Sequence, residues 1–201
     1  MGTSVSSGAA AEHTAHFTLG PDVRVIDPDS EKDVVAGSGE MGVLALGGRN
    51  PIGYYKDEQK SAATFKVIGG VRYSIPGDYA IVEADGSIQL LGRGSVVINT
   101  GGEKVFPEEV EETLKRHPSV FDAVAVGIPD ERFGQAVVTV VELRPGATAT
   151  EDDLIKHTKS HLAGFKAPRR VQFVGSIGRS PSGKVDYGRL RSEATAWAKD
   201  E

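Results

Sequence analysis

The pattern of apolar residues changes at residues 92–95, and this change constrains the fold more than any other feature. Before it, short alternating runs separated by turn residues predict strands; after it, strands alternate with helical segments. A chain of 201 residues can form one domain of ordinary size or two small ones. We therefore place a boundary at 92–95 and expect two structural units of different character.

The first unit is predicted to be a small antiparallel β unit over residues 21–92. Asp85-Gly86 lies between two apolar runs and is a strong hairpin signal. One helical segment is expected, from Asp57 to Phe65, with Asp57 as its N-cap. Residues 1–20 are small, polar and rich in Gly and Ala, so we expect a poorly ordered connection there. The expected strands cover 23–26, 43–46, 71–75, 81–83 and 88–91.

Residues 96–201 are predicted to form a compact α/β domain, so the fold class of the whole chain is α+β. Pro107 followed by glutamates favours a helix start, because proline suits the first turn and carboxylates suit the positive end of the helix dipole. That helix ends near His117-Pro118. The remaining elements are strands at 120–128 and 135–143 separated by Pro129-Asp130, a helix at 150–162 capped by Thr150, a strand at 170–174 and a helix at 186–198.

The composition excludes several classes of protein. The formal net charge of −5 argues against a general nucleic-acid binder, which needs a clustered basic surface. The chain has no cysteine, which excludes disulfides and thiolate metal sites and fits a reducing compartment. No apolar stretch is long enough for a membrane span, and the first eight residues lack the features of a signal peptide. We expect a cytoplasmic protein; the composition leaves the oligomeric state open.

Lys184 is the strongest single candidate for a functional residue. It follows the turn Ser180-Pro181-Ser182-Gly183, so its ammonium group stands on a Gly-containing loop from which it can reach a phosphate or a carboxylate. Gly178 and Lys184 also have the spacing of a phosphate loop. Val185 stands where that motif needs Ser or Thr for magnesium, however, and Pro181 removes one backbone N–H. A phosphate-loop NTPase is therefore the less favoured interpretation.

Three other patterns are interpreted as structural. Residues 37–42 have the glycine spacing of a dinucleotide fingerprint, but they precede a strand instead of opening a helix, which indicates a loop between strands. His157 and His161 have the spacing of a metal-binding pair, but no carboxylate completes a ligand set, and we expect a solvated helix face. Residues 108–112 are interpreted as a solvated helix start, and no metal site is predicted.

Five segments in order resemble the AMP-forming acyl-CoA synthetases, the superfamily shared with luciferase and nonribosomal-peptide adenylation domains. The resemblance covers about residues 20–198, and its details look closest to fatty-acyl and steroid-side-chain CoA ligases. The segments are Tyr73-Ser74-Ile75-Pro76-Gly77-Asp78-Tyr79, Leu91-Gly92-Arg93-Gly94-Ser95, residues 98–111 around Asn99-Thr100-Gly101-Gly102-Glu103-Lys104, Val126-Gly127-Ile128-Pro129-Asp130-Glu131 and Arg179-Ser180-Pro181-Ser182-Gly183-Lys184-Val185.

The resemblance implies a role for each matching residue. Asp78 and Arg93 would contact the ribose of ATP or AMP, and Lys184 would bridge the acyl carboxylate and the α-phosphate. Residues 101–103 (Gly101, Gly102 and Glu103) would approach the pantetheine of CoA. Residues 93–95, with Gly94 and Ser95, would form a hinge between the end of a large N-terminal domain and a mobile C-terminal domain. ATP, CoA and Mg²⁺ are the implied cofactors, and a fatty-acid or steroid-type carboxylate is the implied substrate.

The chain also departs from the family pattern. Ser95 stands where the family usually has Asp or Lys, and Ile75-Pro76 stands where it commonly has Arg-Thr. The family's phosphate loop, acyl pocket and magnesium-binding residues would all precede residue 1. The resemblance therefore implies part of a CoA ligase that is inactive by itself. A non-catalytic binding module with the same fold is the alternative.

Overall fold

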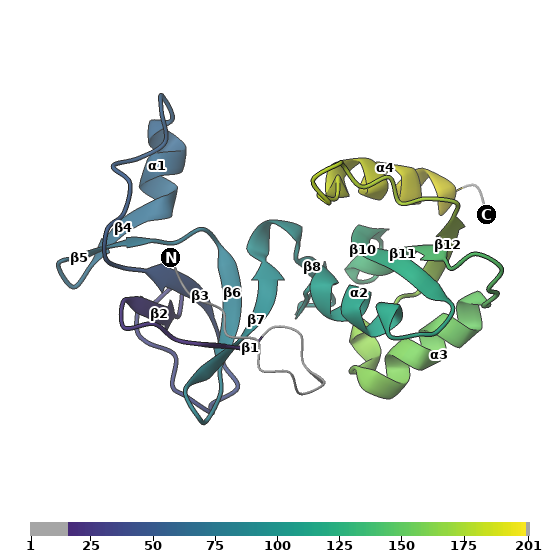
Figure 1. Cartoon of the computed structure of the whole chain (residues 1–201), viewed down its shortest axis with the longest axis horizontal. Coiled ribbons are helices and arrows are strands. Elements are labelled where there is room, and N and C mark those ends of the chain that lie inside the picture. Colours follow the sequence, from purple (N-terminus) through teal and green to yellow (C-terminus); the bar gives the residue numbers. More distant parts are fainter. Residues whose placement is uncertain (1–15, 200–201) are drawn as a thin grey trace. The chain divides into compact units, whose positions relative to one another are not determined.

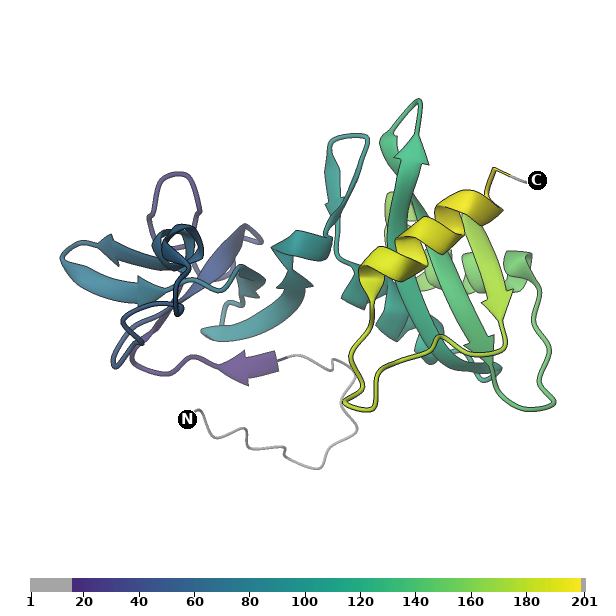
Figure 2. The ribbon, with the colours of Figure 1, turned by 90° about the horizontal axis from the view of Figure 1, so that it is seen from above.

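The computed structural model describes residues 16–199, and it divides into two compact units that meet between Ser95 and Val96. The expected poorly ordered segment 1–20 lies mostly outside the described residues. Its end is ordered, because residues 16–18 form strand β1 (His16–Thr18) and pair with residues 87–89. Figure 1 and Figure 2 show the strands and helices of each unit in two perpendicular views.

The first unit is an antiparallel sheet in which the strands follow the order β1-β7-β6-β3-β5-β4, with β2 paired to β3. The helix lies beside β4 in Figure 1. The elements after β1 are β2 (Val23–Ile26), β3 (Met41–Leu46), α1 (Glu58–Thr64), β4 (Phe65–Ile68), β5 (Val71–Ser74), β6 (Asp78–Val82) and β7 (Ser87–Arg93). The predicted antiparallel unit is confirmed.

Local signals in this unit act as predicted. The Asp57 carboxylate accepts a 2.9 Å hydrogen bond from the Lys60 N–H and caps α1. The turn between β6 and β7 contains Gly86 with φ 81°, a left-handed conformation that glycine adopts without steric cost. The sequence analysis missed β4, because Phe65 was assigned to the end of the helix. Two left-handed glycines, Gly69 and Gly70, return β4 onto β5 and convert this segment into a hairpin.

The second unit is a sheet with the strand order β10-β11-β8-β9, to which β12 adds in parallel beside β11. Its elements are β8 (Ile98–Thr100), β9 (Glu103–Val105), α2 (Pro107–Lys115), β10 (Val120–Asp130), β11 (Gly134–Leu143), α3 (Glu151–His161), β12 (Arg170–Val174) and α4 (Tyr187–Trp197), with single 3₁₀ turns at Gly94–Val96 and Gly164–Lys166. The predicted α/β arrangement is confirmed, including the Thr150 cap of α3, which forms a complete capping box with Asp153.

One boundary in this unit was placed wrongly. Pro129-Asp130 was expected to separate two strands, but both residues belong to β10 and pair with β11. Proline is tolerated there because β10 is an edge strand, so its missing N–H leaves no ladder bond unmade. The turn begins at residue 131, two residues later than expected, and the Asp130 carboxylate accepts from the N–H groups of Arg132 and Phe133 within it.

Strands β10 and β11 are buried on both faces. Ala123 and Ala125 pack with α2 and α3 on one side, whereas Val124 and Val126 pack with α4 on the other. Figure 1 shows α4 on one side of the sheet and α2 with α3 on the opposite side. An uninterrupted apolar run is therefore required in these strands, since alternate residues serve two cores.

Leu114 is fully buried where α2 packs on the sheet. We expect Leu114→Ala to lower the free energy of unfolding of the second unit by about 3 kcal/mol, through lost burial and the cavity left behind. Urea denaturation followed by the fluorescence of Trp197, the single tryptophan, measures this unit. Lys156→Ala on the exposed face of α3 is the control, with an expected change within about 0.5 kcal/mol. An equal loss in both variants would contradict this account of the core.

Candidate functional site

Lys184 ends a short turn that is closed by its own backbone. The Ser180 N–H donates to the Lys184 carbonyl oxygen at 3.0 Å, and the Gly183 N–H donates to the Ser180 carbonyl oxygen at 2.8 Å. The Lys184 N–H donates to the Ser180 hydroxyl oxygen at 3.0 Å. Among residues 16–199 no carboxylate forms an ion pair with the exposed Lys184 side chain. The turn thus holds the lysine backbone and leaves its ammonium group available.

This turn is not a phosphate loop. A phosphate loop needs a helix that begins at the lysine, so that N–H groups at the helix N-terminus face the phosphates. Here α4 begins at Tyr187, and its N-cap Asp186 uses its carboxylate to accept from the Arg189 N–H. The start of α4 is therefore occupied by its own cap, and the less favoured interpretation of Lys184 loses its structural basis.

Arg179 joins the Lys184 turn to strand β10. Its guanidinium donates to both carboxylate oxygens of Asp122, at 2.6 Å and 2.9 Å, and to the Gly183 carbonyl oxygen at 3.2 Å. Burial by itself would raise the pKa of Asp122, but the bonds from Arg179 hold it below its ordinary value. Neither residue was a predicted site residue. The signal available in the sequence was an aspartate at the start of an otherwise apolar strand.

Glu111 and Tyr187 make a second connection between β10 and the segment that contains Lys184. The Glu111 carboxylate accepts from the Ala125 N–H of β10 at 3.0 Å and from the Tyr187 hydroxyl at 3.1 Å. Glu111 is buried, so the prediction of a solvated helix start over residues 108–112 was wrong at this position. An amphipathic helix presents every third or fourth residue to the core, and Glu111 follows Val110 onto the buried side.

Burial raises the pKa of Glu111 to about 7, against the opposing effect of its two hydrogen-bond donors. Tyr187 responds to the same environment, since burial and the adjacent Glu111 carboxyl raise its pKa as well. Glu111 therefore changes its protonation state near neutral pH in the folded chain.

Asp78 and Arg93, the predicted ribose contacts, face each other across β6 and β7. They are paired residues in the sheet register, and the Arg93 Nε donates to the Asp78 carboxylate at 3.3 Å. The Arg93 side chain is 72% exposed and that of Asp78 is 25% exposed. The hairpin brings the two residues together although 15 positions separate them in sequence.

Gly101 and Gly102 form the turn between β8 and β9 in the second unit, and Glu103 is the first residue of β9. Gly101 and Gly102 both have left-handed φ values, 61° and 90°, and the Gly101 N–H donates to the Phe133 carbonyl oxygen at 2.9 Å. A Cβ on Gly101 would lie 3.1 Å from the Phe133 ring, whereas a Cβ on Gly102 would have no atom within 4 Å. Gly102 is therefore the point of this turn that an external group can approach closely.

The expected hinge residue Gly94 has a packing role. Its N–H donates to the Gly77 carbonyl oxygen at 2.9 Å, and a Cβ at this position would lie 2.7 Å from the Tyr79 ring. Any side chain would collide with Tyr79, so close packing explains the glycine without appeal to flexibility. Ser95 follows in a single 3₁₀ turn.

Of the two histidines, His161 is exposed as predicted, whereas His157 is partly buried. The His157 Nε2 lies 2.9 Å from the Thr113 carbonyl oxygen of α2, and its ring packs against those of His117 and His161. Burial lowers the pKa of His157. The expectation of a solvated face was wrong for this residue, because α3 turns it toward α2. Within residues 16–199 no cluster of three or more His, Cys, Asp or Glu side chains could hold a metal ion.

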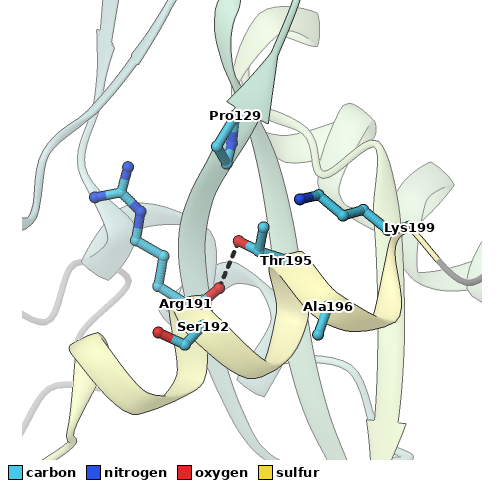
Figure 3. Close-up of a pocket in the computed structure, with 6 residues that line it drawn as sticks. All are labelled: Pro129, Arg191, Ser192, Thr195, Ala196 and Lys199. Carbon is cyan, nitrogen blue, oxygen red and sulfur yellow. Dashed lines mark hydrogen bonds between the residues drawn. The ribbon is translucent and has the colours of Figure 1, made fainter.

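Residues 37–40 form a loop before β3, where the Gly37 N–H donates to the Val82 carbonyl oxygen, and the last two residues of the predicted loop, Met41 and Gly42, begin the strand. A surface hollow elsewhere lies between α4 and the end of β10 (Figure 3). Its hydroxyl groups are engaged by the helix itself, since Ser192 and Thr195 donate to the carbonyl oxygens of Gly188 and Arg191. The hollow contains none of the predicted site residues.

Comparison with known proteins identifies a family domain in the second unit. The family described as the AMP-binding enzyme C-terminal domain matches residues 109–184. The chain carries the C-terminal domain of the AMP-forming acyl-CoA ligase family. The matched residues begin in α2 and end at Lys184 itself, so the family domain contains β10, β11 and β12, the ion pair of Asp122 with Arg179, and the candidate lysine.

Two relatives and one solved structure show the extent of the similarity. A 3-oxocholest-4-en-26-oate–CoA ligase of Rhodococcus rhodochrous is 56% identical over 177 residues, which are 88% of this chain and 30% of the relative. A medium/long-chain-fatty-acid–CoA/3-oxocholest-4-en-26-oate–CoA ligase of Mycolicibacterium smegmatis is 52% identical over 99% of this chain and 35% of its own length. ATP-bound MatB from Rhodopseudomonas palustris aligns with a TM-score of 0.75 and 30% identity, over 90% of this chain and 34% of that one.

The chain thus spans about a third of the length of the relatives that it matches. The ligase names of these relatives do not favour the alternative of a non-catalytic binding module. None of the helices in the described part of the chain has the length and apolar character needed to cross a membrane.

The raised pKa of Glu111 has a consequence for stability. The carboxyl ionises near its ordinary value of 4.5 in the unfolded chain but only near 7 in the folded one, so the unfolded state releases its proton first as the pH rises. We expect this residue to lower the free energy of unfolding by about 3 kcal/mol between pH 4.5 and pH 8.

Glu111→Gln keeps an oxygen acceptor for Ala125 and Tyr187 and cannot ionise. Urea denaturation at pH values from 4.5 to 8 is expected to show the variant gaining stability relative to the natural chain as the pH rises through this window. A difference in free energy of unfolding between the variant and the natural chain that stays constant from pH 4.5 to pH 8 would show that burial does not raise the pKa of Glu111. Glu112→Gln, the same substitution at the neighbouring half-exposed position, is the matched control.

Proposed function

We propose that this chain is the part of an ATP-dependent acyl-CoA ligase that supplies the catalytic lysine and one side of the nucleotide site. The observation that carries the proposal is Lys184, an exposed cation without an ion-pair partner among the described residues, at the end of an internally bonded turn. The reaction is adenylation of a carboxylate followed by transfer of the acyl group to the thiol of CoA.

Lys184 has the properties required for the first step. Adenylation brings a carboxylate up to the α-phosphate of ATP, and negative charge accumulates where the new bond forms and pyrophosphate leaves. An ammonium group that is not already neutralised stabilises this charge without first breaking an ion pair. The flexible lysine stem allows the group to follow the charge as it moves.

The Asp78–Arg93 pair fits a ribose. Asp78 accepts the hydrogen bond from Arg93 through one carboxylate oxygen, and the largely exposed Arg93 guanidinium uses its Nε for this bond. The second carboxylate oxygen can accept from the ribose hydroxyls, and the remaining guanidinium N–H groups can donate to ribose or phosphate oxygens. The exposed pair itself contributes little to stability, which is consistent with a binding role.

The turn at residues 101–103 is proposed to approach the pantetheine arm of CoA. Gly102 leaves open space where a side chain would otherwise stand, so a narrow chain can pass close to the backbone. ATP and CoA are the cosubstrates of the family. Magnesium is proposed to bind through ATP and through residues of the whole ligase, since the described residues contain no cluster that could hold it.

The proposed substrate class is a fatty acid or a steroid side-chain carboxylate. The support is the naming of the relatives as fatty-acid and 3-oxocholest-4-en-26-oate CoA ligases. The chain alone is proposed to be catalytically inactive, because it spans only about a third of such enzymes. Residues 93–95 are proposed to form the hinge between the two units, and a cytoplasmic location is proposed for the whole ligase.

The test uses a chimera in which this chain replaces the matching third of the Rhodococcus rhodochrous relative. We expect carboxylate-dependent exchange of labelled pyrophosphate into ATP, and Lys184→Ala is expected to reduce its rate by about 10²–10³-fold, the usual effect of removing one group that stabilises transition-state charge. Thioester formation from a supplied acyl-adenylate is expected to change much less, because that step needs no stabilisation at the α-phosphate by Lys184.

Lys199→Ala removes another exposed lysine of this unit and is expected to leave the exchange rate unchanged. Full exchange activity in Lys184→Ala would disprove the proposed role of the lysine. Exchange catalysed by the 201-residue chain alone would disprove the proposal that the chain is inactive by itself.

A further inference from the structure

We infer that Asp122 and Arg179 form a clamp that positions Lys184 for adenylation, although neither residue touches the lysine ammonium group. The inference rests on the proposed function of Lys184 and adds two positioning residues to it. Its basis is the chain of contacts from β10 to the turn: the Asp122 carboxylate, the Arg179 guanidinium and the Gly183 carbonyl oxygen.

The geometry of the clamp is specific for arginine. A planar guanidinium makes two parallel bonds to one carboxylate, which fixes its orientation as well as its position. The Nη1 group then reaches the carbonyl oxygen of Gly183, the residue directly before Lys184. A lysine at position 179 could keep the positive charge but could not make the two parallel bonds and the third bond together.

A bulge in β10 makes the clamp possible. Val120 and Ala123 pack into the same core, on the face of α2 and α3, although they are three positions apart. An unbroken strand would place them on opposite faces, and the register shift between Val120 and Asp122 resolves the conflict. The bulge at Phe121 lets Val120 enter that core while Asp122 projects from the other face, which α4 covers.

The segment from Arg179 to Tyr187 is also fixed at its C-terminal end, by a hydrogen bond that does not involve the clamp. Tyr187 is the first residue of α4, three positions after Lys184, and its hydroxyl donates to the buried Glu111. Glu111 in turn accepts from the Ala125 N–H of β10. The turn is therefore fixed to β10 at Arg179, through Asp122, and to α2 and β10 at Tyr187, through Glu111.

This arrangement favours a positioning role. Between the two fixed points, Lys184 has the one polar side chain without a hydrogen-bond or ion-pair partner among the described residues, while the backbone around it is bonded to Ser180. Ordering a loop before the reaction removes the entropy cost of ordering it at the transition state. The Asp122 side chain is 15% exposed. Its surroundings restrict its movement, and the two parallel hydrogen bonds fix the orientation of the Arg179 guanidinium.

The first test measures amide hydrogen exchange of Gly183 and Lys184 in the 201-residue chain. Asp122→Asn and Arg179→Gln are each expected to speed exchange at these amides by at least about tenfold, because the turn loses its attachment to β10. Arg179→Lys is expected to fall between the natural chain and Arg179→Gln. Asp33→Asn breaks an equally short ion pair, Arg24–Asp33 at 2.6 Å in the first unit, and is the control, with no change expected in the turn.

The second test uses the same variants in the ligase chimera. Arg179→Gln is expected to lower kcat for adenylation by about tenfold or more with little change in KM for ATP, as a misplaced catalytic group would. Combined with Lys184→Ala, it is expected to cause no further loss, since a clamp acts only through the lysine it positions. A residue needed only for folding would instead add its effect to that of Lys184→Ala.

Two results would overturn the clamp: unchanged exchange at Gly183 and Lys184 in both variants, or losses of activity that add to that of Lys184→Ala. These outcomes are separate from failure of the proposed function. Full adenylation by Lys184→Ala would disprove the proposed function, whereas an active, Lys184-dependent chimera with an unaltered turn would disprove the clamp alone.

Discussion

The pairing of β10 with β11, buried on both faces, is the constraint on which the second unit depends. Alternate side chains of these strands enter two cores, one covered by α2 and α3 and the other by α4. The helices must therefore lie on opposite sides of the sheet. The Lys184 turn lies between β12 and α4 in the chain, and Arg179 fixes it to Asp122 of the edge strand β10.

The two carboxylates that attach the Lys184 segment to β10 are in opposite electrostatic situations, with Glu111 buried and Asp122 partly buried. Asp122 accepts two bonds from a guanidinium, and this interaction outweighs the cost of burial and keeps the carboxyl ionised. Glu111 accepts only from a backbone N–H and a tyrosine hydroxyl, which are neutral donors, and burial raises its pKa to about 7. The charged partner of Asp122 and its lesser burial both favour the ionised form, whereas Glu111 is more deeply buried and has neutral hydrogen-bond donors. The Lys184 segment is thus attached to β10 through one ionised aspartate and one glutamate that titrates near neutral pH.

The elements that sequence analysis predicted well are those with local signals. Asp57 and Thr150 cap helices through bonds to residues three positions away, and the turn around Gly86 depends only on its immediate neighbours. The incorrect predictions concern residues whose interaction partners are distant in sequence. Pro129 remains in a strand because β11 pairs with it, and Glu111 is buried because Ala125 and Tyr187 bond to it. His157 was assigned to solvent because its partner on α2, Thr113, lies 44 positions earlier.

The sequence by itself determined the succession of strands and helices, the change of character at residues 92–95, and the choice of Asp78, Arg93 and Lys184 as candidates, since the motifs that contain them are contiguous. The tertiary structure decided that Asp78 faces Arg93 and that the Lys184 turn is attached to Asp122, 57 positions before Arg179. No local pattern encodes that attachment. It requires a sheet to bring the two segments together and a bulge to turn Asp122 toward them, and both depend on residues far apart in the chain.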